Sequence, residues 1–145
     1  MPETIFSAAL RLCGLSLREA AEFLGTRLDT VKSWSSGRNQ IPPGVMAELH
    51  ALAARLDEAA AQTADLFVEQ AEALPENEQP TAVELGIAAD DHEARDLGYP
   101  CVGAQMAMAA RVWSYLPPDI TVRLVPRGST VATAAAADEH DKVRD

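Results

Sequence analysis

The stretch of sequence that decides the fold is residues 15–37, LSLREAAEFLGTRLDTVKSWSSG. Ser16, with Glu19 three residues later, has the pattern of a capping box, in which each side chain bonds the backbone N–H of the other residue. Gly25 closes the apolar pattern that follows, and glycine readily takes the left-handed conformation in which helices end. The first half of the stretch therefore predicts a short helix that ends in a tight turn.

The second half of the stretch predicts another short helix, which ends at Gly37. Thr26 is a suitable N-cap for it. Val31 and Trp34 lie three residues apart, so they share one face of this helix and should anchor it in the core. Ala21 in the preceding helix must be small, because we expect the second helix to cross it at close range. The opposite face of the second helix should remain free.

Helices are also predicted on both sides of this stretch. Residues 5–12 carry apolar side chains at helical spacing, and Gly14 follows them. Pro42 and Pro43 suit a helix start, and apolar residues then recur in steps of three and four as far as Ala73. This pattern fits one helix of about 30 residues or two helices with a bend, and either a helix that packs on its own chain or one that dimerises.

The remainder predicts a small α/β unit after a polar, proline-flanked linker at residues 75–80. Residues 81–88 and 121–125 alternate as strands do, residues 102–115 have helical spacing, and the acidic residues 89–98 suggest turns. The predicted helix has an apolar stripe of Met106, Ala109, Ala110 and Trp113. Because two strands alone are marginally stable, this unit needs a partner copy or the long helix to bury its faces.

Charge is distributed unevenly along the chain. The 145 residues carry a formal net charge of −10, which taken whole argues against a general binder of nucleic acid or membranes, because phosphate affinity comes from clustered Lys and Arg. However, residues 57–98 hold twelve acidic side chains and one basic one, whereas residues 1–56 hold five acidic and six basic ones. The acidity therefore belongs to the middle segment, which we expect to point away from any bound DNA.

Residues 5–56 resemble the helix-turn-helix family of the Cro and lambda-repressor type, often called XRE. The matching positions are Leu15, Ser16, Ala21, Leu24, Gly25, Val31, Trp34, Gly37 and Pro42. Four positions depart from the residue types common in that family: Leu17, Thr26, Leu28 and Ser35. The layout of the whole chain is similar to that of the anti-CRISPR-associated (Aca) repressors, which have a helix-turn-helix head, a long helix and a small C-terminal dimerisation domain.

Together, these patterns and the resemblance predict an α+β fold. Its parts are an all-α, lambda-repressor-like helix-turn-helix domain at residues 1–56, a connecting helix at 57–74, the linker at 75–80, a strand-helix-strand dimerisation domain at 81–127 and a flexible tail at 128–145. The resemblance implies that the second helix of the deciding stretch enters the major groove of double-stranded DNA.

Ten side chains are carried over from the resemblance as DNA contacts. The residues that should face the bases are Arg27, Asp29, Thr30 and Ser33. Those that suit the DNA backbone are Arg11, Arg18, Lys32, Arg38, Asn39 and Gln40. Arginine can pair with a guanine edge, and aspartate can accept from a cytosine amine. Each charge could instead be an ordinary solvated group, and Asp29 could pair with Arg27 or Lys32 within the helix.

A nearly neutral head has modest affinity for phosphate, so two copies about 34 Å apart on the DNA should be needed. We therefore expect a transcriptional regulator, in particular a repressor that binds an inverted repeat as a homodimer. One alternative is an antitoxin-type autoregulator, whose acidic residues 57–98 bind a toxin. The other is an adaptor that binds only proteins.

No catalytic, metal or cofactor site is predicted. His50, His92 and His140 do not cluster, and the acidic sequence around His92 lacks a recognised metal-ligand spacing. Ser35 and Ser36 have no nearby histidine that would favour nucleophilic catalysis.

The remaining features predict a cytoplasmic protein without membrane contact. The chain shows no signal-peptide pattern and no apolar run long enough to span a bilayer. Its two cysteines suit a reducing compartment; Cys13 should be buried, and Cys101 has no neighbouring thiol with which to bind zinc. Both tryptophans, Trp34 and Trp113, are expected in the core.

Overall fold

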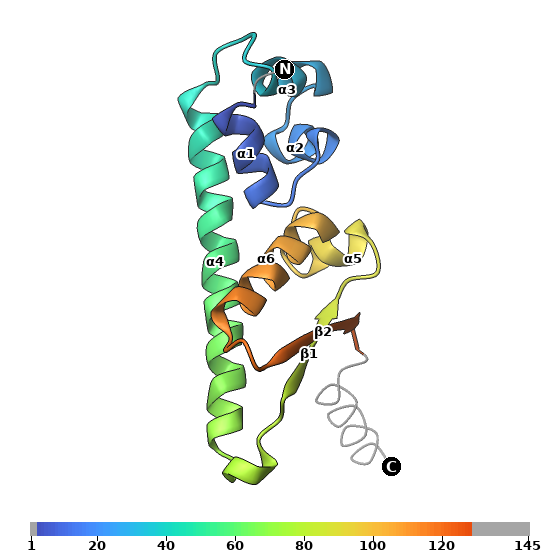
Figure 1. Cartoon of the computed structure of the whole chain (residues 1–145). Coiled ribbons are helices and arrows are strands. Elements are labelled where there is room, and N and C mark those ends of the chain that lie inside the picture. Colours follow the sequence, from blue (N-terminus) through green and yellow to red (C-terminus); the bar gives the residue numbers. More distant parts are fainter. Residues whose placement is uncertain (1–2, 129–145) are drawn as a thin grey trace, which may run out of the picture.

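The computed structural model describes residues 3–128 and combines helices with a two-stranded sheet, which confirms the predicted α+β class. Figure 1 shows the arrangement of the elements. In chain order they are α1 (Ile5–Leu12), α2 (Leu17–Leu24), α3 (Leu28–Ser35), α4 (Pro43–Glu72), the 3-10 helix η1 (Glu76–Glu78), β1 (Ala82–Ile87), α5 (Asp91–Asp96), α6 (Val102–Tyr115) and β2 (Thr121–Pro126). The predicted tail lies outside the described residues, apart from Gly128.

Helix α4 is one continuous helix of 30 residues rather than two. At a rise of 1.5 Å per residue it is about 45 Å long, and the other elements lie along it (Figure 1). Between Val45 and Leu74 it contains neither glycine nor proline. Its buried residues recur at helical spacing: Leu49, Leu52, Leu56, Ala60 and Ala64. Within residues 3–128 no helix, α4 included, is long and apolar enough to cross a bilayer.

The predicted capping box at the start of α2 is confirmed. The Glu19 N–H donates to Ser16 Oγ at 3.1 Å, and the Ser16 N–H donates to Glu19 Oε1 at 2.9 Å. The prediction that Thr26 caps α3 is wrong, since the N-cap is Arg27, whose side chain makes no capping bond. The reason is that the Thr26 N–H donates to the Ala21 carbonyl at 3.0 Å, so Thr26 completes the end of α2.

The two strands are parallel, and the predicted ranges agree with them to within one residue at each end. The connection between the strands contains a helix that the sequence analysis did not predict. Residues 89–98, expected to form turns, include α5, whose N-cap Asp90 accepts from the Glu93 N–H at 2.9 Å. An aspartate N-cap can start a helix even in a short acidic segment.

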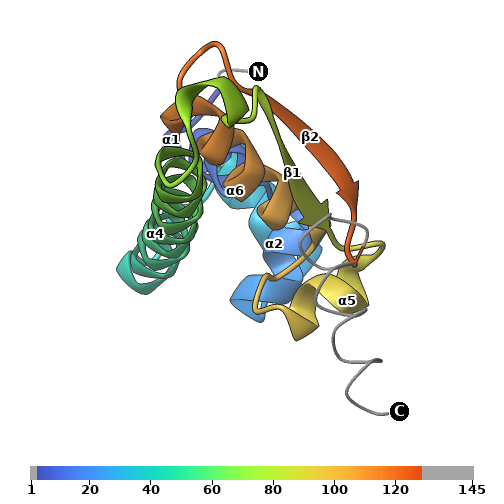
Figure 2. The ribbon, with the colours of Figure 1, turned by 90° about the horizontal axis from the view of Figure 1, so that it is seen from below.

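Helix α6 has its predicted bounds but buries a different face from the one predicted. Met106 is 41% exposed and Trp113 is 66% exposed, whereas Met108 and Val112 are buried. The predictions that Met106, Ala110 and Trp113 face inward and that Trp113 lies in the core are therefore wrong, while Ala109 is buried as expected. Both faces of α6 are apolar, and contact with α4 decides which one is covered. Viewed from below, α6 lies between α4 and the sheet (Figure 2).

The head (residues 3–56) and the C-terminal part (residues 81–127) share one hydrophobic cluster, which includes Phe6 from α1 and Val112 from α6. They also touch through a pair of glycines. A Cβ on Gly14 would overlap the carbonyl oxygen of Gly103, and a Cβ on Gly103 would overlap the carbonyl oxygen of Gly14. Backbone therefore meets backbone where the α1–α2 turn contacts the start of α6.

Candidate nucleic-acid interface

Helix α3 lies at one end of the molecule (Figure 1) and is anchored by its inner face. Val31 is fully buried and Trp34 is 7% exposed, as predicted. The Trp34 ring meets the Phe6 ring edge-on, with ring centroids 5.8 Å apart and an interplanar angle of 77°. Aromatic pairs favour this geometry, so α1 and α3 are held together through the core.

A small hydroxyl network fixes the end of α3, and the sequence analysis did not identify it. Thr4 Oγ1 donates to the Ser35 carbonyl at 2.9 Å, and the Ser7 and Ser35 hydroxyls lie 2.6 Å apart. Thr4 is also the N-cap of α1, where its side chain accepts from the Ser7 N–H. The only signal in the sequence is the position of Thr4 just before an apolar helix, which suggests an N-cap. It does not reveal the contact with Ser35, 31 residues away.

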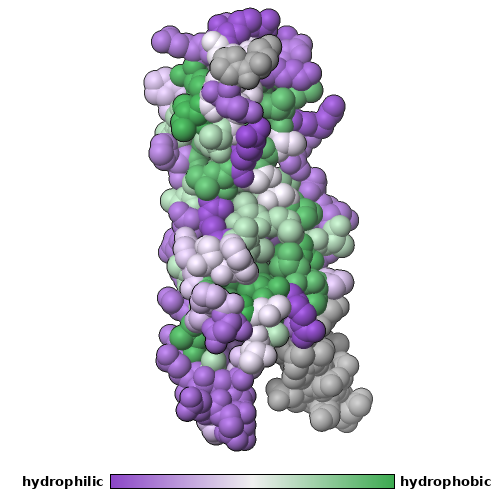
Figure 3. All heavy atoms as spheres, in the orientation of Figure 1, coloured by the Kyte–Doolittle hydropathy of each residue, from purple (hydrophilic) through white to green (hydrophobic). Residues whose placement is uncertain are grey.

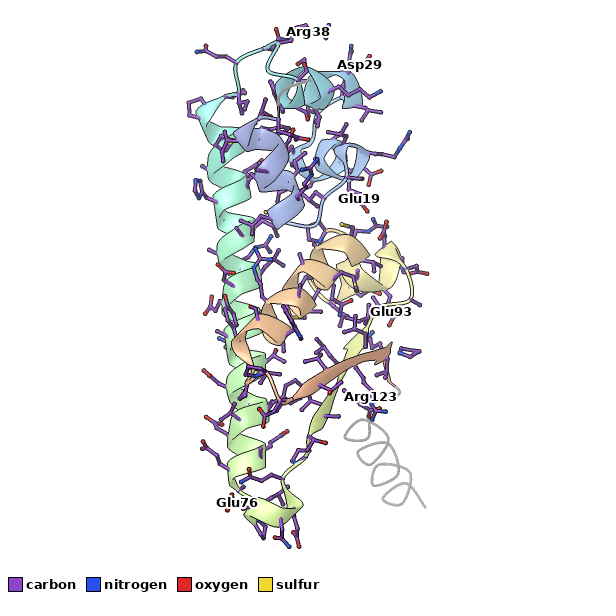
Figure 4. The ribbon with its side chains drawn as sticks, in the orientation of Figure 1. Glu19, Asp29, Arg38, Glu76, Glu93 and Arg123 are labelled. Carbon is purple, nitrogen blue, oxygen red and sulfur yellow. The ribbon has the colours of Figure 1, made fainter. Side chains whose placement is uncertain are left out.

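Most of the predicted DNA-contacting side chains are on the surface. The exposed ones are Arg11, Arg18, Arg27, Asp29, Lys32, Arg38, Asn39 and Gln40, and Thr30 is partly buried. Figure 4 shows Asp29 and Arg38 at the same end of the molecule. Within residues 3–128 no ion pair involves Arg27, Asp29 or Lys32. The intrahelical pairing considered for Asp29 is therefore not seen.

The prediction that Ser33 faces DNA bases is wrong. Its residue surface is 3% exposed, and its hydroxyl donates to the Thr30 carbonyl at 2.7 Å. The Arg38 N–H donates to the Ser33 carbonyl at 2.9 Å, a bond that closes the C-terminal end of α3 after the left-handed Gly37. Leu28, which stands where the family often has a polar residue, is partly buried and packs against the core.

A hollow of about 400 Å³ opens where α1, the start of α2 and the end of α3 meet. It brings together Arg11 and Lys32, which lie 21 positions apart in the sequence. Its lining consists of Glu3, Ser7, Leu10, Arg11, Leu15, Ser16, Leu17, Lys32, Ser35 and Ser36. Two cations, several hydroxyls and the positive end of a helix dipole are groups that favour a bound anion. Arg18, Arg27 and residues 38–40 lie outside this hollow.

Arg11 also has an anionic neighbour of its own. Its Nη2 lies 3.0 Å from Glu3 Oε1, and the two side chains are 73% and 65% exposed. Exposed pairs of this kind contribute little, typically less than about 1 kcal/mol. A phosphate that enters the hollow could therefore replace Glu3 as the partner of Arg11 at small cost.

The acidic segment lies away from α3. Residues 57–98 form the second half of α4, η1, β1 and α5. Figure 4 shows Glu76 at the opposite end of the molecule from Arg38, with Glu93 between them. The strongest negative charge is thus separated along the length of α4 from the exposed side chains of α3.

Both cysteines are buried, as predicted for Cys13, and lie at the contact between the head and the C-terminal part. Cys101 Sγ is 3.9 Å from the Gly14 carbonyl oxygen. Burial raises the pKa of the Cys13 thiol, and burial raises the pKa of Cys101 to about 11. Both thiols are therefore protonated at neutral pH and are poor nucleophiles. Within residues 3–128 no group of three His, Cys, Asp or Glu side chains could hold a metal ion.

No protein-family model matches the chain, and no curated protein matches it either. The likeness to the Cro and lambda-repressor family therefore rests on the sequence positions named above.

Proposed function

We propose that this chain is a sequence-specific DNA-binding transcriptional regulator that inserts α3 into the major groove. The observation that carries the proposal is the hollow lined by Arg11, Lys32 and the start of α2. It lies directly beside α3, whose inner face is anchored by Val31 and Trp34. Recognition of a DNA sequence requires phosphate contacts that position the protein and a fixed helix whose polar side chains reach the base edges in the groove.

In this proposal the position of each side chain decides whether it contacts phosphate or a base. Arg11 and Lys32 hold a phosphate in the hollow, and residues 38–40 contact the backbone from the loop after α3. Arg27 and Asp29, exposed at the start of α3, face the base edges, where arginine suits guanine and aspartate suits the cytosine amine. Thr30 lies beside them, and Ser33 takes no part because it is buried.

The regulator would act as a repressor, by occupying promoter DNA as a homodimer at an inverted repeat, without chemistry of its own. The charge distribution supports two-headed binding. The head has nearly balanced charge and residues 57–98 are strongly acidic, so a single copy should hold DNA weakly. Two linked heads bind much more tightly than one, because the second contact becomes intramolecular.

The test is a fluorescence-anisotropy titration of the full chain against the DNA upstream of its own coding region, with a shuffled duplex as control. We expect specific binding that weakens steeply as salt rises, because phosphate contacts release counterions. Absence of binding at low salt would contradict the proposal and favour the protein-binding adaptor.

One observation favours the antitoxin-type role as a second candidate. A hollow of about 170 Å³ lies on the acidic half of α4, lined by Ala61, Ala64, Asp65, Val68 and Tyr115. Leu66 nearby in the sequence is 51% exposed. An acidic, partly apolar surface suits a basic protein partner. Asp65→Lys would weaken binding of such a partner while leaving the DNA titration unchanged, whereas loss of both would argue against separate surfaces.

A further inference from the structure

Helix α1 borders two hollows of different character. Ser7 and Arg11 on one face line the polar hollow described above. The opposite face carries a strip of apolar residues at helical spacing, which lines a second hollow of about 380 Å³: Ile5, Ala8, Ala9 and Leu12. Helix α4 supplies the other wall of this second hollow, which we call the apolar hollow.

The side chains that line the apolar hollow offer almost no polar groups. Cys13 and Leu49 in its lining are both buried, and α4 adds Met46 and Ala53. Within the described part of the chain, His50 is the one lining side chain that carries a nitrogen or oxygen atom. A hydrogen-bonding group on an occupant would therefore find its side-chain partner at His50.

Two large apolar side chains of this lining are exposed in the described structure. The exposed fraction is 74% for Ile5 and 56% for Leu12. Figure 3 shows hydrophobic surface over α1 and the adjoining part of α4, in the upper left of the view. Because removal of apolar surface from water is favourable, an apolar molecule held between the two helices gains affinity by covering these side chains.

We propose that the apolar hollow binds a small, uncharged, mainly apolar molecule with one hydrogen-bonding group, which contacts His50. Sites for small ligands have volumes of about 300–1,000 Å³ and hydrophobic walls with a few polar groups. The volume of about 380 Å³ lies near the lower end of that range, so it suits a compact ligand such as a compound with two fused rings. This inference concerns binding alone and does not depend on the proposed function.

The absence of charge in the lining selects an uncharged occupant. Within residues 3–128, no Asp, Glu, Lys or Arg side chain lines the apolar hollow. A charged group that entered it would lose hydration without gaining an opposite charge, which is costly. The last eight residues of the chain, 138–145, carry six charged side chains, so this segment does not suit the hollow. The same holds for a strongly charged protein partner.

The first test compares two probes of similar size and opposite charge character, 2-naphthol and 2-naphthoate. Equilibrium dialysis of the full chain at neutral pH measures the affinity and the stoichiometry for each. We expect one 2-naphthol per chain and binding of 2-naphthoate that is about tenfold weaker or more, because its carboxylate has no counter-charge in the lining. Absence of 2-naphthol binding, or equal affinity for the two probes, would overturn the proposal.

The second test locates the bound probe by filling the hollow. Ala53→Phe places a large side chain in the lining and should remove 2-naphthol binding. Ala54→Phe is the matched control, since Ala54 is exposed on the same helix and lies outside the lining, and it should bind the probe like the wild type. Leu12→Asn keeps the test valid if Ala53→Phe does not fold, because Leu12 is exposed and its loss should weaken binding. Wild-type affinity in the folded lining variants would overturn the site.

A third measurement separates a small ligand from a second copy of the chain as the occupant. The mass of the wild type and of Ile5→Asp is determined by size exclusion with light scattering. We expect the same mass for both, since the proposed site is not an interface between copies. A wild-type oligomer that dissociates in Ile5→Asp would assign the hollow to a second copy and overturn the proposal.

The outcomes also distinguish this inference from the proposed function. Binding of 2-naphthol by a chain that does not bind DNA supports the ligand site and removes the DNA-binding role. Operator binding by a chain that does not bind 2-naphthol supports that role and removes the ligand site.

Discussion

Substitutions of individual side chains around α3 should have different effects on DNA binding. Lys32 lines the hollow beside the start of α2 and makes no ion pair within residues 3–128. In the proposed complex it contacts phosphate. Arg27 and Asp29 at the start of α3 are the side chains assigned to base edges. This difference leads to separate predictions for affinity and for specificity.

Lys32→Ala should weaken binding to all DNA sequences by a similar factor and reduce the slope of log K against log salt by about one. The measurement is the anisotropy titration at several salt concentrations. Arg95→Ala on α5 is the matched control, because it removes the same charge outside the head. Equal effects of the two substitutions would show that only net charge matters, and would contradict the site.

Ser33→Ala should lower the free energy of unfolding by about 1 kcal/mol, because it removes the bond to the Thr30 carbonyl. It should leave base preference unchanged, whereas Asp29→Ala should relax preference at one base pair. Urea denaturation and binding to a set of single-base operator variants measure the two effects. A change of base preference in Ser33→Ala would restore Ser33 to the interface.

The pKa of Cys101 leads to a pH dependence of stability. Burial raises this pKa from its ordinary value of 9.0 to about 11, so the folded state holds the proton more tightly than the unfolded chain does. The resulting stabilisation is fully present below about pH 9 and is lost as pH rises through about 11. The midpoint of urea denaturation should therefore fall over this range, and fall less in Cys101→Ala. An identical fall in both proteins would exclude Cys101 as the cause.

At the scale of elements, the contact of the α1–α2 turn with the start of α6 positions the head on the rest of the molecule. Gly14 has φ +71°, whereas Gly103 is limited only by the space its neighbour leaves. The constraint at Gly103 is therefore steric, which makes it the cleaner site for a test.

Gly103→Ala should destabilise the fold by about 2 kcal/mol, because the new methyl group meets the Gly14 carbonyl oxygen and forces the two segments apart. Gly44→Ala is the control. An added Cβ there has nothing within 4 Å, so the change should be close to neutral. Thermal denaturation of both variants is the measurement, and equal melting temperatures would contradict the close approach.

Several elements could be predicted from sequence because their signals are local. The capping box at Ser16 and Glu19 and the glycine at position 25 act within a few residues of the helix they delimit. The buried face of α6 could not be predicted in the same way. Its two candidate stripes, represented by Met106 and Met108, are both apolar, and only the neighbouring α4 decides which is covered.

At the scale of the whole molecule, charge and shape are arranged along one axis. Helix α3 lies at one end, and the acidic η1 lies at the other. The segmental charge difference was visible in the sequence, but its separation in space depends on α4 being one unbroken helix. With a bend in α4, residues 57–98 could have been carried back toward the head.

The candidate site was predictable in part. Exposure of Arg27, Asp29 and Lys32 was implied by the family resemblance, and these three side chains are exposed in the structure. The burial of Ser33 was not, because it depends on how α3 packs against the neighbouring helices of the head. The meeting of Arg11 with Lys32 depends on how α1 packs against α3, which no short sequence pattern encodes.

By itself, the sequence determined most of the helices, both strands, the capping box at Ser16 and Glu19 and the uneven charge, because each of these depends on residues close together along the chain. Only the tertiary structure decided which face of α6 is buried, how Gly14 meets Gly103, and which cations share a hollow. Those features depend on contacts between segments far apart in the sequence. Alternative ways of packing these segments would bury similar apolar area, and the close approach of their backbones decides which packing is adopted.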